Sequence, residues 1–332
     1  SALLAAGILL LPATQYPATT WWSKPDLDRE YVLSLDVEHY FGNIQKMRKH
    51  LETDRQILWV SYYRNLYNAT HPSEINSPVS LSRNLLAWNQ PGTNGLILPV
   101  NPSASFLSIL FANELWFTLG DMTMAEHCAM LSMIFSPRNS GSRMIKRLAE
   151  INLVNGDDEA ALKYLRILDK TLLHKSWAEK RIPGQQTPRV KEWLEKKRRD
   201  IPTQDQLRSG NDAVTSLRNL VASNAGNLRA YEYLLCYHLL SKDLRSFVED
   251  YVPGKVSSPI FAEALLIHLA RQGNIRAEEL IKYQIPVEIA KEFADYTRIY
   301  EAKDTSLKEK YGKTYWFYYH FATTEPGKES KP

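Results

Sequence analysis

The amino-acid sequence predicts an all-α protein, built as an α-solenoid of antiparallel helix pairs. Apolar residues recur at three- and four-residue spacing along most of the chain, which is the period of an α-helix. Glycine is scarce, at 14 of 332 residues, whereas a β-sandwich needs many tight turns. A short pattern of Gly and Ala also returns after 36 positions, first at Gly120 and again at Gly156. Together these observations favour stacked helix pairs over sheets.

The composition contains enough apolar residues for a core, and its charge and cysteines argue against some classes of function. Hydrophobic residues make up 44% of the chain, with 18 Tyr, 10 Phe and 8 Trp. The net charge of +4 is concentrated in residues 175–200, where nine Lys/Arg face four Asp/Glu. A local basic patch of this kind does not predict specific nucleic-acid binding. Cys128 and Cys236 form no C-x-x-C pair, so we expect two buried thiols and no zinc ribbon.

Residues 1–25 combine an apolar segment with a linker. Ala2 to Leu11 is uncharged and apolar, and it ends at Pro12. A spanning helix needs about 20 residues, so this run cannot cross a bilayer alone. It is either the end of a spanning helix or signal segment, or a core helix, and the sequence favours the first.

We expect residues 26–90 to form an N-terminal helical lobe. Apolar spacing predicts helices over residues 28–38 and 43–51, joined by a tight turn. A further helix is predicted over residues 55–68, and a short one over residues 80–88.

Residues 90–102 form the longest irregular stretch, with three prolines and two glycines. Because proline ends helices, we expect a packed loop here. It separates the lobe from a helical repeat array over residues 91–325.

The repeat array is defined by a glycine that ends one helix and an alanine five residues later. Gly120, Ala125 and a closing Pro137 follow this frame, and Gly156 and Ala161 repeat it. The glycine supplies the left-handed cap that reverses the chain, and the alanine lets two helices approach closely. Each such frame therefore predicts one helix pair.

Two further segments have a similar pattern of a helix end followed by the start of a second helix. Gly273 is followed by Ala277, and the apolar segment 231–240 is followed by Lys242 and Asp243 in place of a glycine. Because a single helix pair cannot bury its own apolar face, the pairs must stack.

The frames at Gly120 and Gly156 resemble tetratricopeptide repeats, whose period is near 34 residues. The resemblance covers about half of the chain. It departs from the family pattern at Ala129 and Leu165, where that family carries a large aromatic residue. The resemblance implies a TPR-like superhelix that binds a protein or peptide in a concave groove.

A second resemblance spans the segments 147–179, 231–244 and 312–321. These are similar to an uncharacterised Bacteroidetes family in which a multi-pass membrane part precedes a soluble, repeat-like part. That similarity implies that residues 2–11 end a spanning helix. It also implies that the chain is membrane-anchored through a preceding part. We further expect the soluble domain to be extracytoplasmic.

A groove of this kind is lined mainly by the first helix of each pair. Arg143, Lys146 and Glu150 share one helical face at three- and four-residue spacing. The tetratricopeptide resemblance implies that the two cations grip a peptide carboxylate, whereas a solvated surface is their plainer interpretation. The candidate groove residues are Asn113, Glu114, Arg143, Lys146, Glu150 and Arg229.

The sequence contains no motif for catalysis, cofactor binding or metal binding. Eight histidines are present, but none forms H-E-x-x-H, and no phosphate loop or nucleophile elbow occurs. Glu114, Glu150 and Glu263 lie on predicted helices, and solvated or salt-bridged carboxylates are their plainest interpretation. We therefore expect a non-enzymatic protein- or peptide-binding scaffold without cofactors. The alternative is a glycan-binding or carbohydrate-active helical protein with an aromatic-lined cleft.

A basic amphipathic helix is predicted over residues 189–199, with Val190, Trp193 and Leu194 on one side. One interpretation is a contact with anionic lipid or nucleic-acid phosphate. The favoured one is a Trp-anchored surface helix with a solvated basic face, standing apart from the repeats.

Aromatic residues concentrate in segments 59–67 and 315–321. Rows of Tyr and Trp can stack on sugar rings or grip peptides. At helical spacing they are more often core residues, and we expect the second group to cap the last repeat.

Overall fold

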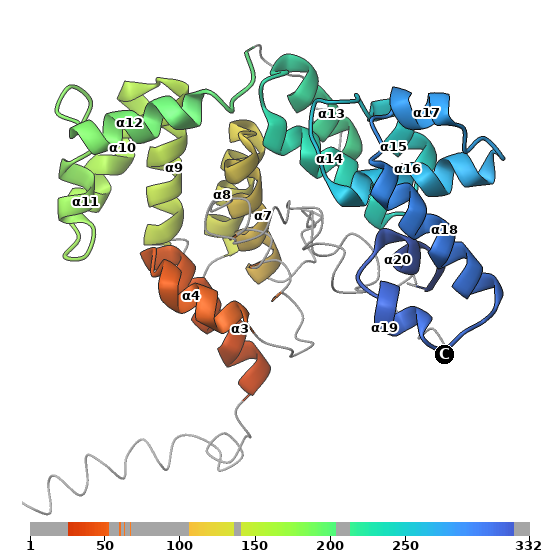
Figure 1. The fold of residues 1–332 in the computed structure, drawn as a ribbon. Helices are drawn as coiled ribbons and strands as arrows, with labels where there is room; N and C mark the ends of the chain where they lie inside the picture. The colour runs from red at the N-terminus through yellow and green to blue at the C-terminus, as the bar shows by residue number, and fades with distance from the viewer. Residues whose placement is uncertain are drawn as a thin grey trace, which may run out of the picture. The chain divides into compact units, whose positions relative to one another are not determined.

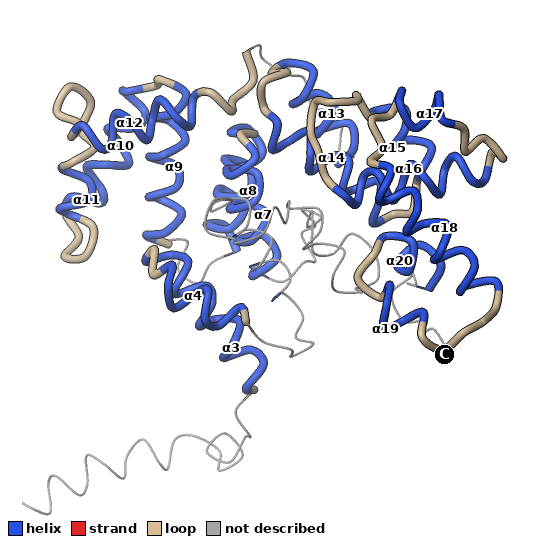
Figure 2. The backbone as a smooth tube through the Cα atoms, viewed as in Figure 1, coloured by secondary structure: helices blue, strands red, loops and turns tan. Residues whose placement is uncertain are grey.

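The computed structural model describes residues 26–52, 106–135, 141–203 and 213–321, together with residues 60, 63 and 67 (Figure 1). Every regular element in these ranges is a helix, and no strand occurs among them (Figure 2). The all-α prediction is therefore confirmed for the described part of the chain. The chain divides into two compact units, Ser1–Tyr63 and Arg64–Pro332.

The first unit contains α3 (Leu27–Phe41) and α4 (Ile44–Leu51), which are the two helices predicted there. Gly42 has a φ of +68°, a left-handed conformation that glycine adopts without steric cost. The N–H of Asn43 then donates to the carbonyl of Glu38 at 2.8 Å. This bond closes the helix end, so the chain reverses within two residues.

Several predictions for the N-terminal third lie outside the described residues. These include the apolar segment 2–11, the short helix 80–88 and the irregular stretch 90–102 with its domain boundary. The predicted helix 55–68 is described only at residues 60, 63 and 67, which are helical and buried.

The described part of the second unit is a succession of short helices. Their bounds are α7 (Phe106–Leu119), α8 (Met122–Phe135), α9 (Ser142–Asn155), α10 (Asp158–Asp169), α11 (Lys175–Glu179), α12 (Pro188–Arg198), α13 (Ala213–Ser223), α14 (Leu228–Leu240), α15 (Leu244–Asp250), α16 (Pro259–Arg271), α17 (Ala277–Lys282), α18 (Val287–Glu301), α19 (Leu307–Tyr311) and α20 (Tyr315–Phe321). None of the described helices combines the length and apolar composition that crossing a bilayer requires.

One turn geometry recurs between successive helices. A glycine with positive φ closes the helix end, directly after the helix at Gly120 and Gly156 and one residue later at Gly273, as the glycine frame predicts. Lys242 takes the same left-handed conformation, with a φ of 57°, at the turn predicted to lack a glycine. In each case the next N–H bonds a carbonyl five residues back, which satisfies the helix end.

The residue after the cap starts the next helix. The Asp157 carboxylate accepts from the N–H of Ala160 at 2.9 Å, and Asp243 accepts from Ser246 at 3.0 Å. Asp121 makes the same bond to Met124 at 2.8 Å. The Gly-Asp pair thus closes one helix and caps the following one, so two residues suffice to reverse the chain.

The predicted small residues are buried in two frames and not in the third. Ala125 and Ala161 are fully buried, which permits close approach of α7 to α8 and of α9 to α10. Ala277 is exposed, and α17 buries none of its residues, so the expectation of close packing is wrong there. Pro137 lies outside the described residues.

The C-terminal aromatic segment is core, as expected. Tyr315, Trp316, Phe317 and Tyr318 are all buried in α20. The carboxylate of buried Glu263 in α16 accepts from the N–H of Tyr315 at 2.6 Å, and the Trp316 indole donates to the Glu263 carbonyl at 2.9 Å. Glu263 therefore caps a helix and is not a solvated carboxylate. Cys128 and Cys236 are free and buried, which confirms their prediction.

Candidate functional site

The predicted groove residues of α7 face inward. Asn113 is fully buried, and its side-chain amide donates to the carbonyl of Ala125 at 2.6 Å. Glu114 is also buried, and its carboxylate binds Arg143 at 3.0 Å and Arg147 at 2.5 Å, both from α9. These side chains hold α7 against its neighbours, so the Asn113 amide N–H and the Glu114 carboxylate are used within the protein.

Arg147 is the centre of this arrangement, and sequence reasoning passed over it. Its guanidinium binds Glu114 on one side and Glu150 at 3.2 Å on the other. It also lies 3.8 Å from the ring centroid of Phe117. Only 11% of its side chain is exposed. The available signal was its spacing, because it stands four residues after Arg143 and three before Glu150 on the same helical face.

Lys146 extends from this cluster towards the next helix. Its ammonium lies 5.1 Å from the ring centroid of Trp177 in α11. Burial lowers the pKa of Lys146, and the nearby Glu150 carboxylate opposes that shift. Of the six predicted residues, Glu114, Arg143 and Glu150 therefore belong to the ion pairs around Arg147, Asn113 binds α8 instead, and Lys146 leads away from the cluster.

Arg229, the sixth predicted residue, lies at the C-terminal end of α7. It donates to the carbonyl of Thr118 at 3.1 Å, while Asn227 donates to Leu119 at 2.7 Å. Lys197 of α12 lies 3.3 Å from the carbonyl of Phe117 and donates to it. Three successive carbonyls at a helix end thus receive donors from distant segments, two of them cationic, as the helix dipole favours.

The basic helix α12 is consequently part of the fold, and the expectation that it stands apart from the repeats is wrong. Most of its cations are exposed, as expected for a solvated basic face. Arg198 donates to the carbonyls of Leu153 at 2.7 Å and Val154 at 3.0 Å, at the C-terminal end of α9. Burial lowers the pKa of Lys197 to about 8, with further lowering from Arg229. Two of the cations of this helix, Lys197 and Arg198, are thus bound to helix ends.

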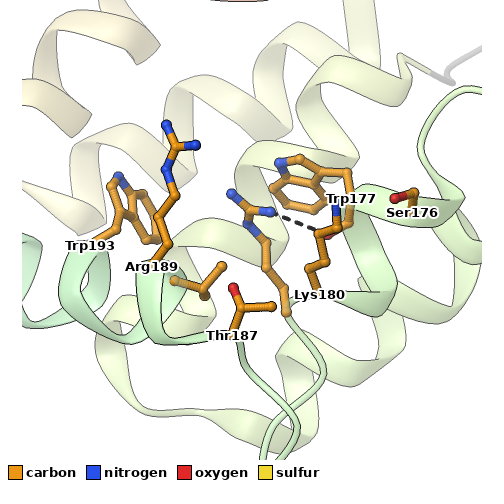
Figure 3. Close-up of a pocket in the computed structure, with 8 residues that line it drawn as sticks. Ser176, Trp177, Lys180, Thr187, Arg189 and Trp193 are labelled. Carbon is orange, nitrogen blue, oxygen red and sulfur yellow. Dashed lines mark hydrogen bonds between the residues drawn. The ribbon is translucent and has the colours of Figure 1, made fainter.

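A pocket of about 640 Å³ opens between α11 and the start of α12 (Figure 3). Its lining combines two indoles, three cations and two hydroxyls with no carboxylate, histidine or cysteine. The lining residues are Ser176, Trp177, Lys180, Arg181, Thr187, Arg189, Val190 and Trp193. We call this the Trp177–Trp193 pocket.

The indoles are held in place by neighbours within the protein. The Arg181 guanidinium lies 4.0 Å from the Trp177 ring centroid and donates to the Trp177 carbonyl at 3.2 Å. Trp193 stacks on Phe117, with ring centroids 6.3 Å apart and planes 26° apart. Phe117 also contacts Arg147, so one aromatic side chain joins the pocket wall to the buried ion pairs.

The chemistry of this lining favours binding over catalysis. Three cations without a carboxylate among the lining residues create a positive site, and the indoles offer apolar surface beside it. No lining residue has a side chain that would serve as a general base near neutral pH. Among the described residues, no group of three or more metal-ligating side chains occurs.

A family model, but no individual protein, matches this chain. No curated protein and no solved structure matches the chain. A family model described as a family of unknown function (DUF6057) matches residues 1–322, and the chain therefore belongs to that family.

Proposed function

We propose that this chain is a non-enzymatic helical-repeat scaffold that binds an acidic segment of a protein or peptide partner in the Trp177–Trp193 pocket. The observation that carries the proposal is the lining itself, which contains Lys180, Arg181 and Arg189 and no acidic residue. Arginine binds carboxylates through two parallel hydrogen bonds. The uncharged indole rings beside the cations exclude water, and charged hydrogen bonds are stronger where water is excluded.

The repeat architecture is part of the same proposal. The left-handed cap followed by an Asp N-cap at Gly120, Gly156 and Lys242 supports a TPR-like solenoid of stacked hairpins. In such an array, binding sites arise where side chains of adjacent helices project together. We place the binding site at α11 and α12 and not at Arg143 and Glu150. The side chains of Arg143 and Glu150 are already used in the ion pairs of Glu114 and Arg147.

The alternative, a glycan-binding function, is less well supported at this pocket. Neutral sugars stack on open indole faces and use carboxylates and amides as hydrogen-bond partners. Here Trp177 has Arg181 and Lys146 over its ring, and Trp193 stacks on Phe117. Both arrangements suit a ligand with an anionic group next to an apolar group better than they suit a sugar ring.

The test is fluorescence anisotropy with three labelled peptides of equal length. One carries Asp and Glu and a free C-terminus, the second has the same sequence with an amidated C-terminus, and the third replaces its acids by amides and is amidated. We expect Arg189→Gln and Lys180→Gln to weaken binding of the acidic peptides about fivefold each. Both residues are exposed, so folding should be preserved.

Lys191→Gln is the matched control, because it removes an exposed cation from the same helix outside the pocket lining. It should change affinity less than about twofold. Equal binding of all three peptides, or equal effects of all three substitutions, would contradict the proposal. Binding of a neutral oligosaccharide that Arg189→Gln leaves unchanged would favour the alternative function.

We also propose that the chain is membrane-anchored with its repeat domain extracytoplasmic. Support comes from the apolar segment 2–11, which lies outside the described residues, and from the resemblance to a family in which a membrane part precedes a soluble one. Fractionation of cells expressing the natural protein, with protease added to intact spheroplasts, tests this. Recovery in the soluble fraction, or protection of the repeat domain from protease, would refute it.

A further inference from the structure

The exposed face of α10 carries a basic stripe. Lys163, Arg166, Ile167 and Lys170 follow one another at helical spacing, and all four are exposed. The residues that α10 buries, which are Ala161, Leu165 and Leu168, lie on the opposite side. Two acidic residues are nearby. Glu159 lies on the same face at the N-terminal end of α10, and Asp169 lies next to this face at the C-terminal end. The stripe is therefore most positive towards the C-terminal end of the helix.

Two leucines follow directly at that end. Leu172 is 97% exposed and Leu173 is 84% exposed, in the turn between α10 and α11. Full burial of leucine is strongly favourable, so adjacent leucines with this exposure are unusual in a soluble surface. From residue 163 to residue 175 the chain carries four Lys/Arg and one Asp/Glu. The apolar tip thus stands within a positive surface.

The turn is built so that the leucines project. The Thr171 hydroxyl donates to the Leu168 carbonyl at 2.7 Å and accepts from the N–H of His174 at 3.2 Å. The His174 ring in turn lies 3.2 Å from the Ser142 hydroxyl at the start of α9. Both ends of the Leu172–Leu173 pair are therefore fixed by hydrogen bonds, and the exposure belongs to the folded turn.

We propose that the basic face of α10 and the Leu172–Leu173 tip bind the surface of an anionic lipid bilayer. The leucines insert among the acyl chains near the headgroups, and Lys163, Arg166 and Lys170 contact the lipid phosphates. Charge complementarity favours this occupant. A convex tip with few apolar side chains among long, flexible cations fits a fluid surface, whereas a folded partner needs a matching groove. The proposal depends neither on the Trp177–Trp193 pocket nor on residues 2–11.

The experiment is co-sedimentation of the full chain with vesicles of phosphatidylcholine alone and of phosphatidylcholine with 30% phosphatidylglycerol. We expect binding to the anionic vesicles that weakens steeply between 50 and 500 mM salt. Lys163→Gln/Arg166→Gln/Lys170→Gln should weaken it about 100-fold, from roughly fivefold for each cation. Leu172→Ser/Leu173→Ser should weaken it at least about tenfold.

Matched controls remove the same groups elsewhere in the chain. Lys291→Gln/Lys308→Gln/Lys313→Gln removes three exposed cations, and Ile281→Ser removes a side chain that is 77% exposed. Both should leave vesicle binding within about twofold, and circular dichroism melts should show that all variants fold.

Wild-type affinity in the α10 and tip variants would overturn the proposal, because the binding would then arise from another segment. Equal binding to neutral and anionic vesicles would also overturn it. If the wild type binds neither vesicle, the membrane proposal is refuted, and an acidic protein becomes the occupant to test. Substitutions in the Trp177–Trp193 pocket should leave vesicle binding unchanged, so the two proposals fail separately.

Discussion

Gly120 and Gly156 permit a matched test of how closely α7 approaches the end of α12. Both glycines have positive φ, +94° and +82° respectively. A Cβ at Gly156 would meet nothing within 4 Å, whereas a Cβ at Gly120 would press on the Asp200 backbone, 2.8 Å from its carbonyl carbon. Gly156→Ala therefore measures backbone strain alone, and Gly120→Ala measures strain together with displacement of α12.

The expected costs follow from these contacts. An L-residue in the left-handed region costs about 1–2 kcal/mol, so Gly156→Ala should lower the free energy of unfolding by about 1 kcal/mol. Overpacking against backbone adds about 1–3 kcal/mol, so Gly120→Ala should cost about 3 kcal/mol. The displacement would also disturb Asn227, which bonds the carbonyls of Leu119 and Asp200 at 2.7 Å each.

Urea titrations followed by circular dichroism measure both variants against the wild type. Asn tolerates the left-handed conformation, so Gly156→Asn should recover most of the loss at that site. Gly120→Asn should not recover it, because the steric conflict with Asp200 remains. Equal costs for the two alanine variants would refute the close approach of α7 and α12, and with it the placement of Trp193 in the pocket wall.

Three further predictions concern buried polar groups. Arg147→Met leaves Glu114 and Glu150 without their shared cation, and the side chains of these two residues are only 8% and 12% exposed. The free energy of unfolding in the same urea titration should therefore fall by about 3–5 kcal/mol. Replacing Glu114 by Gln as well should recover part of this loss, and a fully additive double variant would contradict the coupling. Burial lowers the pKa of Lys197 from 10.5 to about 8, so the unfolded chain binds this proton more tightly than the folded one. The free energy of unfolding should therefore rise between pH 7 and pH 10. In the wild type this rise should exceed that of Lys197→Met by about 2.5 kcal/mol. A parallel pH dependence in the two proteins would show that Lys197 is not desolvated. Asn227→Ala removes donors from two carbonyls and the cap on Ala230, and a loss below about 1 kcal/mol would contradict the role of this residue at the end of α7.

Local signals in the chain predicted the helices and their turns. The apolar period places α3, α4 and the pairs from α7 to α10, because burying one face of a helix requires residues at that spacing. The turns at Gly120 and Gly156 follow from the need for a left-handed residue at a helix end. The turn at Lys242 shows the limit of this rule, because a lysine holds the same conformation when the surrounding hydrogen bonds impose it. Ala277 shows a second limit, since a small residue predicts close packing only if another helix is there to pack.

The site depended on contacts between residues far apart in the chain. Sequence spacing placed Arg143, Lys146 and Glu150 on one helical face, but it did not reveal that Arg147 would take both carboxylates. The roles of Lys197 and Arg198 could not be predicted, because their partners are backbone carbonyls, which every residue carries.

By itself, the sequence determined an all-α chain, the turns at Gly120, Gly156, Lys242 and Gly273, and the absence of recognisable catalytic motifs. Only the tertiary structure decided which charges are bound internally and which line the Trp177–Trp193 pocket. The physical reason is that helix formation depends on neighbours within a few residues. The partners of Lys197 and Asn227, by contrast, lie 80 and 108 residues away, and folding alone brings them together.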